Sequence, residues 1–182
     1  MKWLFFVLVF GMAPAHADDA FWDTMRQPGV QAVMRHAIAP GTGDPRDFTL
    51  GDCSTQRNLS ETGRAQSRAI GAAFRENGIT IDRVMSSQWC RCLDTAELLD
   101  LAPVEELESL NSFFRNRSLR DEQTEATLQW LAALPDGQKT LLVTHQVNVT
   151  ALTGVYPTSG EIVAFSLKDQ GDITVHGTLT IR

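Results

Sequence analysis

The sequence predicts an α/β fold, in which one largely parallel sheet is covered by helices on both faces. Three observations carry this prediction. Apolar runs of strand length alternate with segments of helical periodicity, no repeat or low-complexity linker divides the chain, and 182 residues fit one domain with a normal core. Alternation of this kind is typical of parallel sheets, because a parallel connection needs a crossover that a helix usually supplies.

Residues 1–17 are expected to be a secretory signal peptide, which leaves residues 18–182 as a single mature domain. Lys2 supplies a positive charge, the next residues are almost wholly apolar, and Ala15 and Ala17 form a small-residue cleavage site. The apolar run is too short to span a bilayer comfortably. We therefore expect a periplasmic or secreted protein without stable membrane insertion of the mature chain; an uncleaved membrane anchor is the alternative.

The first strand is expected at residues 30–35, followed by a loop rich in glycine, proline and aspartate at residues 38–58. A helix is expected at residues 60–76, because small and apolar residues recur there at three-to-four spacing. Ser60 is a suitable N-cap for this helix, and Asn77 with the following glycine is a suitable stop.

The remaining elements continue the alternation. They are a strand at 81–85, a helix at 88–100, a short strand near 104, a helix at 119–134, a strand at 140–144, a helix at 146–152, and two final strands at 161–167 and 172–181. A turn at residues 168–171 joins the last two strands. The central sheet is therefore expected to be mostly parallel.

The charge balance argues against one class of partner. The formal net charge is −6 at neutral pH. Nucleic-acid binding depends on clustered lysine and arginine that neutralise phosphates, so an acidic chain is a poor candidate for it.

The three cysteines predict one disulfide and one remaining thiol, because export places them in an oxidising compartment. Cys90 and Cys92 have a Cys-x-Cys spacing without a second ligand pair, which does not match a metal site. On a helix these two side chains point about 200° apart, so only one of them can face Cys53 in the long loop. The sequence leaves open which one does.

Two histidines directly follow predicted strands, His36 after the first and His145 after the strand at 140–144. In an open α/β sheet the carboxyl ends of the strands face a common crevice, so the two can converge there. Arg35 precedes the first histidine, Arg57 closes the long loop, and Arg91 lies near the start of a helix. Three arginines around two histidines could neutralise a phosphoryl dianion and hold it in line for attack by a histidine.

The residues that carry this chemistry occur in four short motifs, at 35–37, 57–66, 86–96 and 144–145. In this order they resemble the signatures of the histidine phosphatase superfamily, the phosphoglycerate mutase-like proteins, and the resemblance extends from residue 30 to residue 152. It implies a three-layer α/β/α sandwich with a mostly parallel central sheet, in which His36 is the nucleophile that becomes phosphorylated. It also implies that Arg35, Arg57, Arg91 and His145 bind the phosphoryl group.

The sequence departs from the superfamily at three places. Ala37 and Gln146 stand where a glycine commonly follows each histidine, and Gln146 could contact the substrate or cover the pocket. Glu105, Glu106 and Glu108 lie near the position where mutase-like members place an acidic proton donor, but none is in the expected register. The general acid is therefore unassigned, and the substrate could have a leaving group that needs little protonation.

Two other features are expected to be structural. His176 lies in the last strand without a partner motif, and we interpret it as a hydrogen-bonded structural residue. The arginine-rich segment 115–120 is expected on a solvated face, with a basic edge facing the substrate as the alternative.

Together these residues predict an exported phosphohydrolase that cleaves a phosphate monoester through a phosphohistidine on His36, without metal or organic cofactor. The expected substrate is a small-molecule or envelope phosphate ester. The main alternative is a catalytically degenerate protein of the same fold that binds a phosphate ester or polyanion, and a metal-dependent hydrolase is the third. The sequence identifies neither the substrate nor the oligomeric state.

Overall fold

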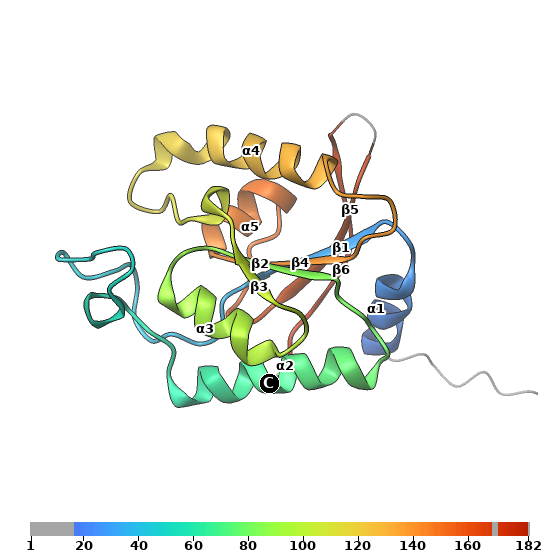
Figure 1. Ribbon diagram of the computed structural model, residues 1–182, viewed down its shortest axis with the longest axis horizontal. Helices are drawn as coiled ribbons and strands as arrows, with labels where there is room; N and C mark the ends of the chain where they lie inside the picture. Colours follow the sequence, from blue (N-terminus) through green and yellow to red (C-terminus); the bar gives the residue numbers. More distant parts are fainter. Residues whose placement is uncertain (1–16, 169–170, 182) are drawn as a thin grey trace, which may run out of the picture.

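The computed structural model describes residues 17–168 and 171–181, so the predicted signal peptide falls, apart from Ala17, outside the described residues (Figure 1). The larger elements, in chain order, are α1 (Ala17–Arg26), β1 (Val30–Arg35), α2 (Glu61–Glu76), β2 (Arg83–Ser86), α3 (Cys90–Leu99), β3 (Val104–Glu106), α4 (Arg120–Ala132), β4 (Thr140–Thr144), α5 (Gln146–Thr153), β5 (Ile162–Leu167) and β6 (Ile173–Leu179). Short 3₁₀ turns lie in the connections before α2 and between β3 and α4.

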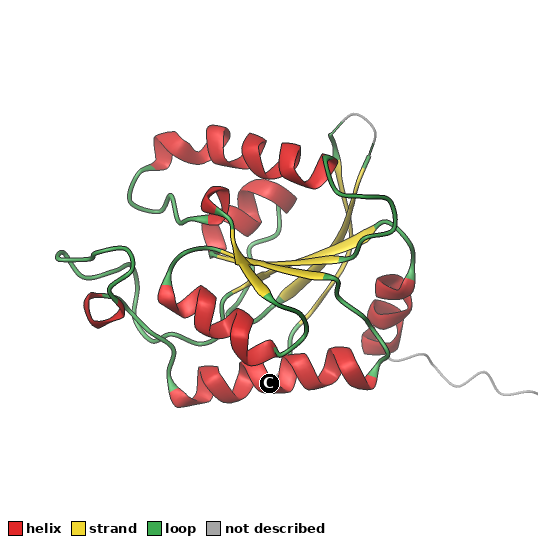
Figure 2. Cartoon of the chain, viewed as in Figure 1, coloured by secondary structure: helices red, strands yellow, loops and turns green. Residues whose placement is uncertain are grey.

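The described strands form one sheet in the order β3-β2-β4-β1-β5-β6 (Figure 2). The first four strands in this order pair in parallel, whereas β5 pairs antiparallel with β1 and β6 antiparallel with β5. Arg35 is in register with Thr144, and Ser86 is in register with Val143. Strands β1, β2 and β4 therefore end at the same edge of the sheet, and the predicted mixed, mostly parallel α/β fold is confirmed.

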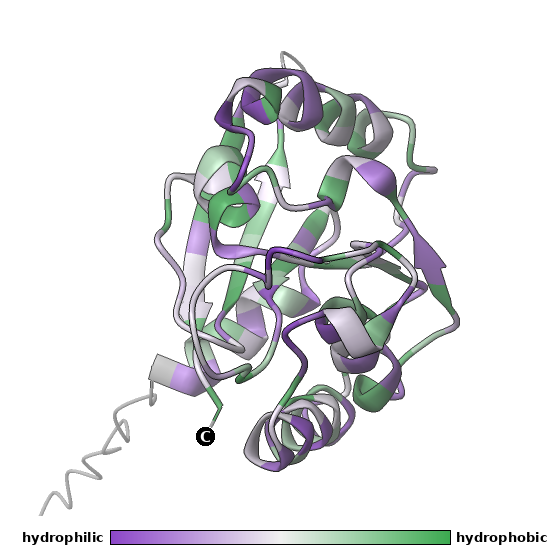
Figure 3. Cartoon of the chain, turned by 90° about the vertical axis from the view of Figure 1, so that its left-hand side faces the viewer, coloured by the Kyte–Doolittle hydropathy of each residue, from purple (hydrophilic) through white to green (hydrophobic). Residues whose placement is uncertain are grey.

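Helices cover both faces of the sheet, which gives the predicted three layers (Figure 1). Neighbouring residues of β1 point to opposite faces: Met34 packs with residues of α1, α2 and α3, whereas Val33 packs with residues of α4 and α5. Figure 3 shows hydrophobic residues along the central strands and hydrophilic residues on parts of the outer helices. The near-continuous apolar runs of β1 and β4 follow from burial on both faces.

The local signals for α2 are confirmed. The Ser60 hydroxyl accepts a hydrogen bond from the backbone N–H of Gly63 at 3.0 Å, and the helix ends before Asn77. The next two elements begin two residues later than expected, at Arg83 and Cys90. The helix is delayed because the chain continues along the sheet edge at Ser87, whose N–H donates to β4.

Helix α1 was not predicted from the sequence. Its side chains Phe21, Trp22 and Met25 are buried against the sheet and α2, and Trp22 makes an edge-to-face contact with Phe74. Their spacing is that of one helix face, but they lie directly beside the expected cleavage site. Within residues 17–168 and 171–181, none of the helices has the length and apolar character needed to cross a membrane.

Candidate active site

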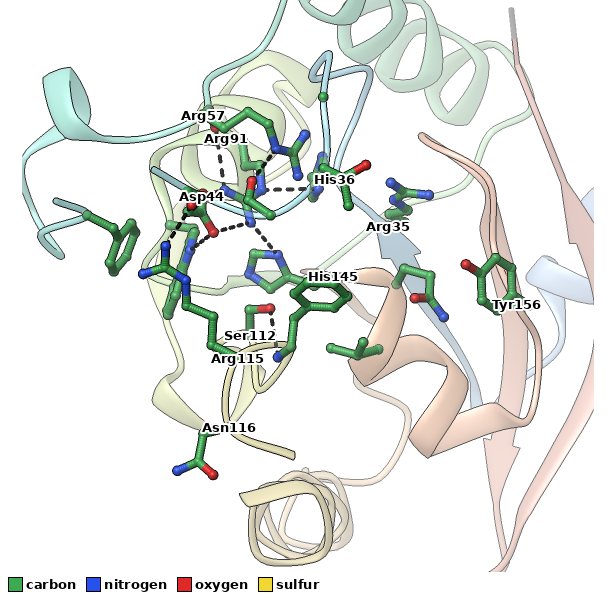
Figure 4. Close-up of a pocket in the computed structure, with 18 residues that line it drawn as sticks. Arg35, His36, Asp44, Arg57, Arg91, Ser112, Arg115, Asn116, His145 and Tyr156 are labelled. Carbon is green, nitrogen blue, oxygen red and sulfur yellow. Dashed lines mark hydrogen bonds and ion pairs between the residues drawn. The ribbon is translucent and has the colours of Figure 1, made fainter. Parts of the chain in front are cut away.

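The ends of β1, β2 and β4 bring three polar residues to one edge of the sheet, and Figure 4 shows two of them, His36 and His145. His36 follows β1, Ser87 follows β2 and His145 follows β4. The N–H of His36 donates to the carbonyl of Thr144 at 2.8 Å, and that of Ser87 donates to Val143 at 3.0 Å. The predicted convergence is therefore present, with the two imidazole centroids 5.7 Å apart.

The hydrogen bonds of His36 determine its tautomer. Its Nδ1 lies 2.7 Å from the carbonyl oxygen of Ala37, which can only accept, so Nδ1 carries the proton. Nε2 accepts a hydrogen bond from Nε of Arg91 at 3.1 Å. Burial, followed by the nearby Arg91 guanidinium, lowers the pKa of His36 well below its ordinary value. At neutral pH the ring is therefore uncharged, and the lone pair of Nε2 is on the side of Arg91.

His145 is held by a chain of hydrogen bonds. Its Nδ1 accepts from Nη2 of Arg91 at 3.2 Å, because a guanidinium can only donate. The neutral ring then carries its proton on Nε2, which donates to the Ser87 hydroxyl at 2.9 Å, and that hydroxyl donates to the Asn111 side chain at 3.2 Å. Burial and Arg91 lower the pKa of His145 well below its ordinary value. Sequence reasoning noted Ser87 at a strand end but did not predict this contact.

Arg91 connects the two imidazoles. It lies in the first turn of α3 and is 2% exposed, and its guanidinium donates to both rings. Because α3 begins at Cys90, an arginine in its first turn reaches back over the sheet edge, as the sequence predicted. A buried planar guanidinium is well suited to bidentate binding of phosphate or carboxylate.

The other two predicted arginines line the same cavity. Arg57 donates to the carbonyl oxygens of Gly43, at 2.7 Å, and Ala39. Burial, followed by Arg91, lowers the pKa of Arg57 to about 10. Arg35 donates from Nη1 to Pro157 at 3.3 Å, while its buried Nε has no hydrogen-bond partner among the described residues. A buried N–H without an acceptor is available for a ligand.

Asp44 is the main residue of the site that sequence reasoning missed. Its carboxylate pairs with Arg91, from Oδ1 to Nη1 at 2.5 Å and from Oδ2 to Nη2 at 3.2 Å, and it accepts from the Trp89 indole at 3.2 Å. Burial raises the pKa of Asp44, but the hydrogen bonds from Arg91 and Trp89 outweigh it, and the net pKa is lowered. A single aspartate in a glycine-rich loop carries no sequence signal that would have identified it.

The cavity has a volume of about 360 Å³. Apart from the histidines and the three arginines, its walls include aromatic and polar side chains from several loops, namely Phe48, Trp89, Ser112, Phe114, Arg115, Asn116, Gln146 and Tyr156. Residues 115–120 are all exposed, as expected, and the first two of them also line the cavity, which is the alternative of a basic edge facing the site. The Arg115 guanidinium faces the cavity because it donates to the backbone carbonyls of Asp44 and Pro45.

The acidic residues considered from the sequence lie elsewhere. Glu105 pairs with Arg83 at 2.6 Å, and Glu106 accepts from the Gln88 amide at 3.0 Å. Of the described residues that line the cavity, Asp44 is the sole carboxylate. No group of three or more acidic, histidine or cysteine side chains placed to hold a metal ion occurs in the described residues.

The disulfide joins Cys53 to Cys90, with a Cα–Cα distance of 5.7 Å. One of the two pairings left open by the sequence is thus confirmed, and the bridge ties the long loop to the start of α3. Cys92 points to the opposite side of the helix, where it is buried with its sulfur 3.5 Å from Nε2 of His145. Burial raises the pKa of the Cys92 thiol to about 12.

Comparison with known proteins confirms the resemblance drawn from the sequence. The family model of the histidine phosphatase superfamily (branch 1) matches residues 33–114, which include Arg35, His36, Arg57 and Arg91. No curated protein matches the chain.

Solved structures with the same fold are distant in sequence. The protein histidine phosphatase SixA, solved with tungstate, is 20% identical, with 83% of this chain and 96% of that chain covered and a TM-score of 0.57. A mycobacterial glucosyl-3-phosphoglycerate phosphatase is 16% identical, with 82% of this chain and 97% of that chain covered and a TM-score of 0.59. A phosphoserine phosphatase from Entamoeba histolytica, solved with 3-phosphoglyceric acid, is 12% identical, with 84% of this chain and 98% of that chain covered and a TM-score of 0.60. At these identities the likeness establishes the fold.

Proposed function

We propose that this chain is an exported phosphohydrolase that cleaves a phosphate monoester through a phosphohistidine intermediate on His36. One observation carries the proposal: the unprotonated Nε2 of a buried, neutral His36 lies beside a cavity that three arginines and a second histidine also line. The match to the histidine phosphatase superfamily supports it. The cavity is much larger than a phosphoryl group, which leaves room for an organic leaving group.

In the proposed reaction, Nε2 of His36 first releases its hydrogen bond from Nε of Arg91, and its lone pair then attacks phosphorus and forms an N–P bond. The P–O bond to the ester breaks, and its electron pair stays on the leaving oxygen, which takes up a proton. Water then attacks phosphorus and gives up a proton to the solvent, the N–P bond breaks with its electron pair returning to Nε2, and phosphate leaves neutral His36. Arg35, Arg57 and Arg91 would stabilise the negative charge on the transferring group, and the mechanism uses no metal ion or organic cofactor.

His145 would contact the phosphoryl group through Nδ1. This contact needs the tautomer with the proton on Nδ1, in which Nε2 accepts a hydrogen bond. Ser87 permits both tautomers, because a hydroxyl can either accept from Nε2 or donate to it. Gln146 also lines the cavity, and we propose that it contacts the leaving group.

The alternative is a catalytically degenerate protein that binds a phosphate ester or polyanion. Ala37 raised this alternative, because alanine tolerates a positive φ poorly. Of the described non-glycine residues, only Asp100 has a positive φ, so the backbone at Ala37 suits alanine. This removes one argument for degeneracy.

The proposal is tested by assaying the purified mature protein against a panel of phosphate esters, with and without a chelator. Wild type is expected to turn over at least one monoester equally in both conditions. His36→Ala is expected to lose essentially all turnover, whereas the control His176→Ala, at an exposed position on β6, should keep it. Acid-labile, base-stable phosphate on His36 should appear in quenched wild type. Turnover by a folded His36→Ala protein would exclude the mechanism, and binding of esters without turnover would favour the alternative.

We also propose that residues 1–17 are removed on export and that residues 18–182 form the mature domain. The Cys53–Cys90 bridge supports an oxidising compartment such as the periplasm. Mass spectrometry of protein from the periplasm of an expressing bacterium should find an N-terminus near Asp18. An intact N-terminus in membrane fractions would instead identify an uncleaved anchor.

A further inference from the structure

The segment 39–44, here called the strap, covers two of the arginines proposed to bind phosphate. Arg57 donates to the strap carbonyls of Ala39 and Gly43, and Arg91 donates to the side chain of Asp44. The strap is itself held from the other side of the cavity, because Arg115 donates to the carbonyl of Asp44 at 2.6 Å. In Figure 4 the Asp44 side chain lies among these guanidinium groups and beside His145.

Every N–H group of the Arg91 guanidinium has an acceptor. A guanidinium has five N–H donors. Nε donates to His36, Nη1 to Asp44 and to the Arg57 carbonyl at 3.4 Å, and Nη2 to Asp44 and His145. A phosphoryl oxygen can therefore bind Arg91 only if one of these acceptors leaves.

Asp44 is the acceptor whose departure the chemistry favours. Its two carboxylate oxygens occupy Nη1 and Nη2 in the bidentate manner in which two phosphoryl oxygens would bind. The proposed reaction takes both histidines off Arg91, because Nε2 of His36 attacks phosphorus and Nδ1 of His145 becomes a donor, but it frees neither of the N–H groups that Asp44 occupies. Glycines with positive φ at positions 41 and 43 give the strap backbone conformations that other residues rarely adopt.

We propose that Asp44 is an internal anion that competes with the substrate for Arg91, so that a ligand must bind the arginines as strongly as a phosphoryl dianion does in order to displace it. This inference rests on the proposed function, since it takes Arg91 as a phosphate ligand. A carboxylate carries one negative charge, whereas a phosphate monoester carries close to two at neutral pH. The dianion therefore gains more from the arginines than Asp44 loses, while a phosphodiester or a carboxylate offers no such gain.

The test compares Asp44→Asn and Asp44→Ala with Asp47→Asn, an exposed aspartate of the same loop, as the control. Calorimetry should show inorganic phosphate binding to the two Asp44 variants at least about tenfold more tightly than to wild type, since the competing charge-assisted pair is lost. Dimethyl phosphate, a monoanionic probe, should gain by the same factor, because an internal competitor weakens every ligand of Arg91 equally. The control Asp47→Asn should bind inorganic phosphate and dimethyl phosphate with the affinities of wild type.

Displacement of Asp44 can be observed directly, because the Trp89 indole N–H donates to its carboxylate. In ¹H–¹⁵N spectra, saturating phosphate should move the wild-type Trp89 indole signal upfield, towards its position in unliganded Asp44→Ala. Trp89→Phe assigns the signal. Binding of phosphate with this signal unmoved, or affinities of both Asp44 variants equal to or weaker than wild type, would overturn the proposal.

A different role for Asp44 would be visible in turnover. If Asp44→Asn loses kcat with alkyl phosphates but not with nitrophenyl phosphate, and phosphate binds no more tightly, Asp44 is a proton donor and the competitor role is wrong. The binding measurements can be repeated in His36→Ala, so they remain informative if His36 is not the nucleophile. Failure of the proposed function and failure of this inference are thus distinguishable.

Discussion

The position of Arg91 makes it the residue on which the whole site depends. Its planar group contacts both histidines and Asp44 at once, with hydrogen bonds in fixed directions. Lysine would keep the charge at this position but would offer a single flexible ammonium.

We therefore expect Arg91→Lys to lower kcat/KM by about 100-fold, the order of effect seen when one oriented donor of a transition state is lost. Vanadate mimics the five-coordinate phosphorus, so its affinity should fall as well. Arg68→Lys, at an exposed position of α2, is the control and should leave both unchanged. Equal vanadate affinity in Arg91→Lys and wild type would place Arg91 outside the phosphate site.

The sequence predicted the site residues that lie in or beside regular structure, and it predicted the loop residue Arg57 through the motif at residues 57–66. His36, His145 and Arg91 each follow or begin an element, so the rule that strand ends converge was enough to place them. Asp44 and Arg115 lie in loops, where side-chain positions depend on tertiary contacts such as the Arg115–Asp44 hydrogen bond. No local pattern in the sequence encodes contacts of this kind.

At the scale of elements, the close approach of α2 to α3 depends on a glycine. A Cβ added to Gly71 would lie 1.9 Å from the carbonyl oxygen of Leu99 in α3. Without a side chain at this position, the α2 surface lies directly against the end of α3, the helix that carries Arg91.

We expect Gly71→Ala to lower the free energy of unfolding by about 1–3 kcal/mol, the usual cost of overpacking a core. At a solvent-exposed helix position the same change would raise the free energy of unfolding by about 1 kcal/mol. The sign of the measured change therefore separates overpacking from helix propensity. Urea denaturation measures the difference, with Thr62→Ala on the exposed side of α2 as the control. An unchanged or higher stability of Gly71→Ala would show that the helices move apart easily.

The sequence predicted poorly those elements whose bounds or stability depend on tertiary contacts with other parts of the chain. The strand and helix types from β1 to β6 were predicted correctly because their periodicity is strong. Helix α3 begins two residues later than predicted, because Ser87 continues the sheet edge through a bond to β4 that the local sequence does not encode. Helix α1 is only ten residues long, and its stability depends on the packing of Phe21 and Met25 against the rest of the core.

The Cys53–Cys90 bridge links the loop that contains Asp44 and Arg57 to the first turn of α3. The paired variant Cys53→Ser with Cys90→Ala should lose about 2–4 kcal/mol of stability, because the unfolded chain gains conformational freedom. Turnover should fall as well, since Arg57 and Arg91 are then less firmly held. Thermal unfolding and assays of wild type with and without a reductant provide the comparison, and three titratable thiols in wild type purified from the periplasm would contradict the bridge.

At the scale of the whole molecule, the site lies where the two halves of the core meet the sheet edge. One cluster of apolar side chains lies under α1, α2 and α3, and the other lies under α4 and α5, with the buried histidines at the strand ends between them. The stability of the fold and the protonation of the site are therefore coupled.

The coupling predicts how stability depends on pH. Burial, followed by Arg91, lowers the pKa of both His36 and His145 well below 6.5 in the folded protein. In the unfolded chain both return to the ordinary value of about 6.5, so between the folded and unfolded values the unfolded state binds more protons. The stabilisation that each uncharged histidine gives to the folded state is fully present above about pH 6.5 and is lost as the pH falls below that value. The slope should approach about 1.4 kcal/mol per pH unit for each histidine.

Urea denaturation at pH values from about 7 to about 5 should therefore show a steady fall in the free energy of unfolding below about pH 6.5. His36→Gln removes one of the two groups and should reduce the slope by about half, whereas Thr62→Ala, at an exposed position of α2, removes no titratable group and should leave it unchanged. Carboxylates such as Asp44, whose folded pKa is lowered from 3.8, lose their contribution only at lower pH and do not interfere in this range. A slope in His36→Gln equal to that of wild type would mean that the fold does not lower the pKa of His36, because a group with the same pKa in the folded and unfolded states contributes nothing to the slope.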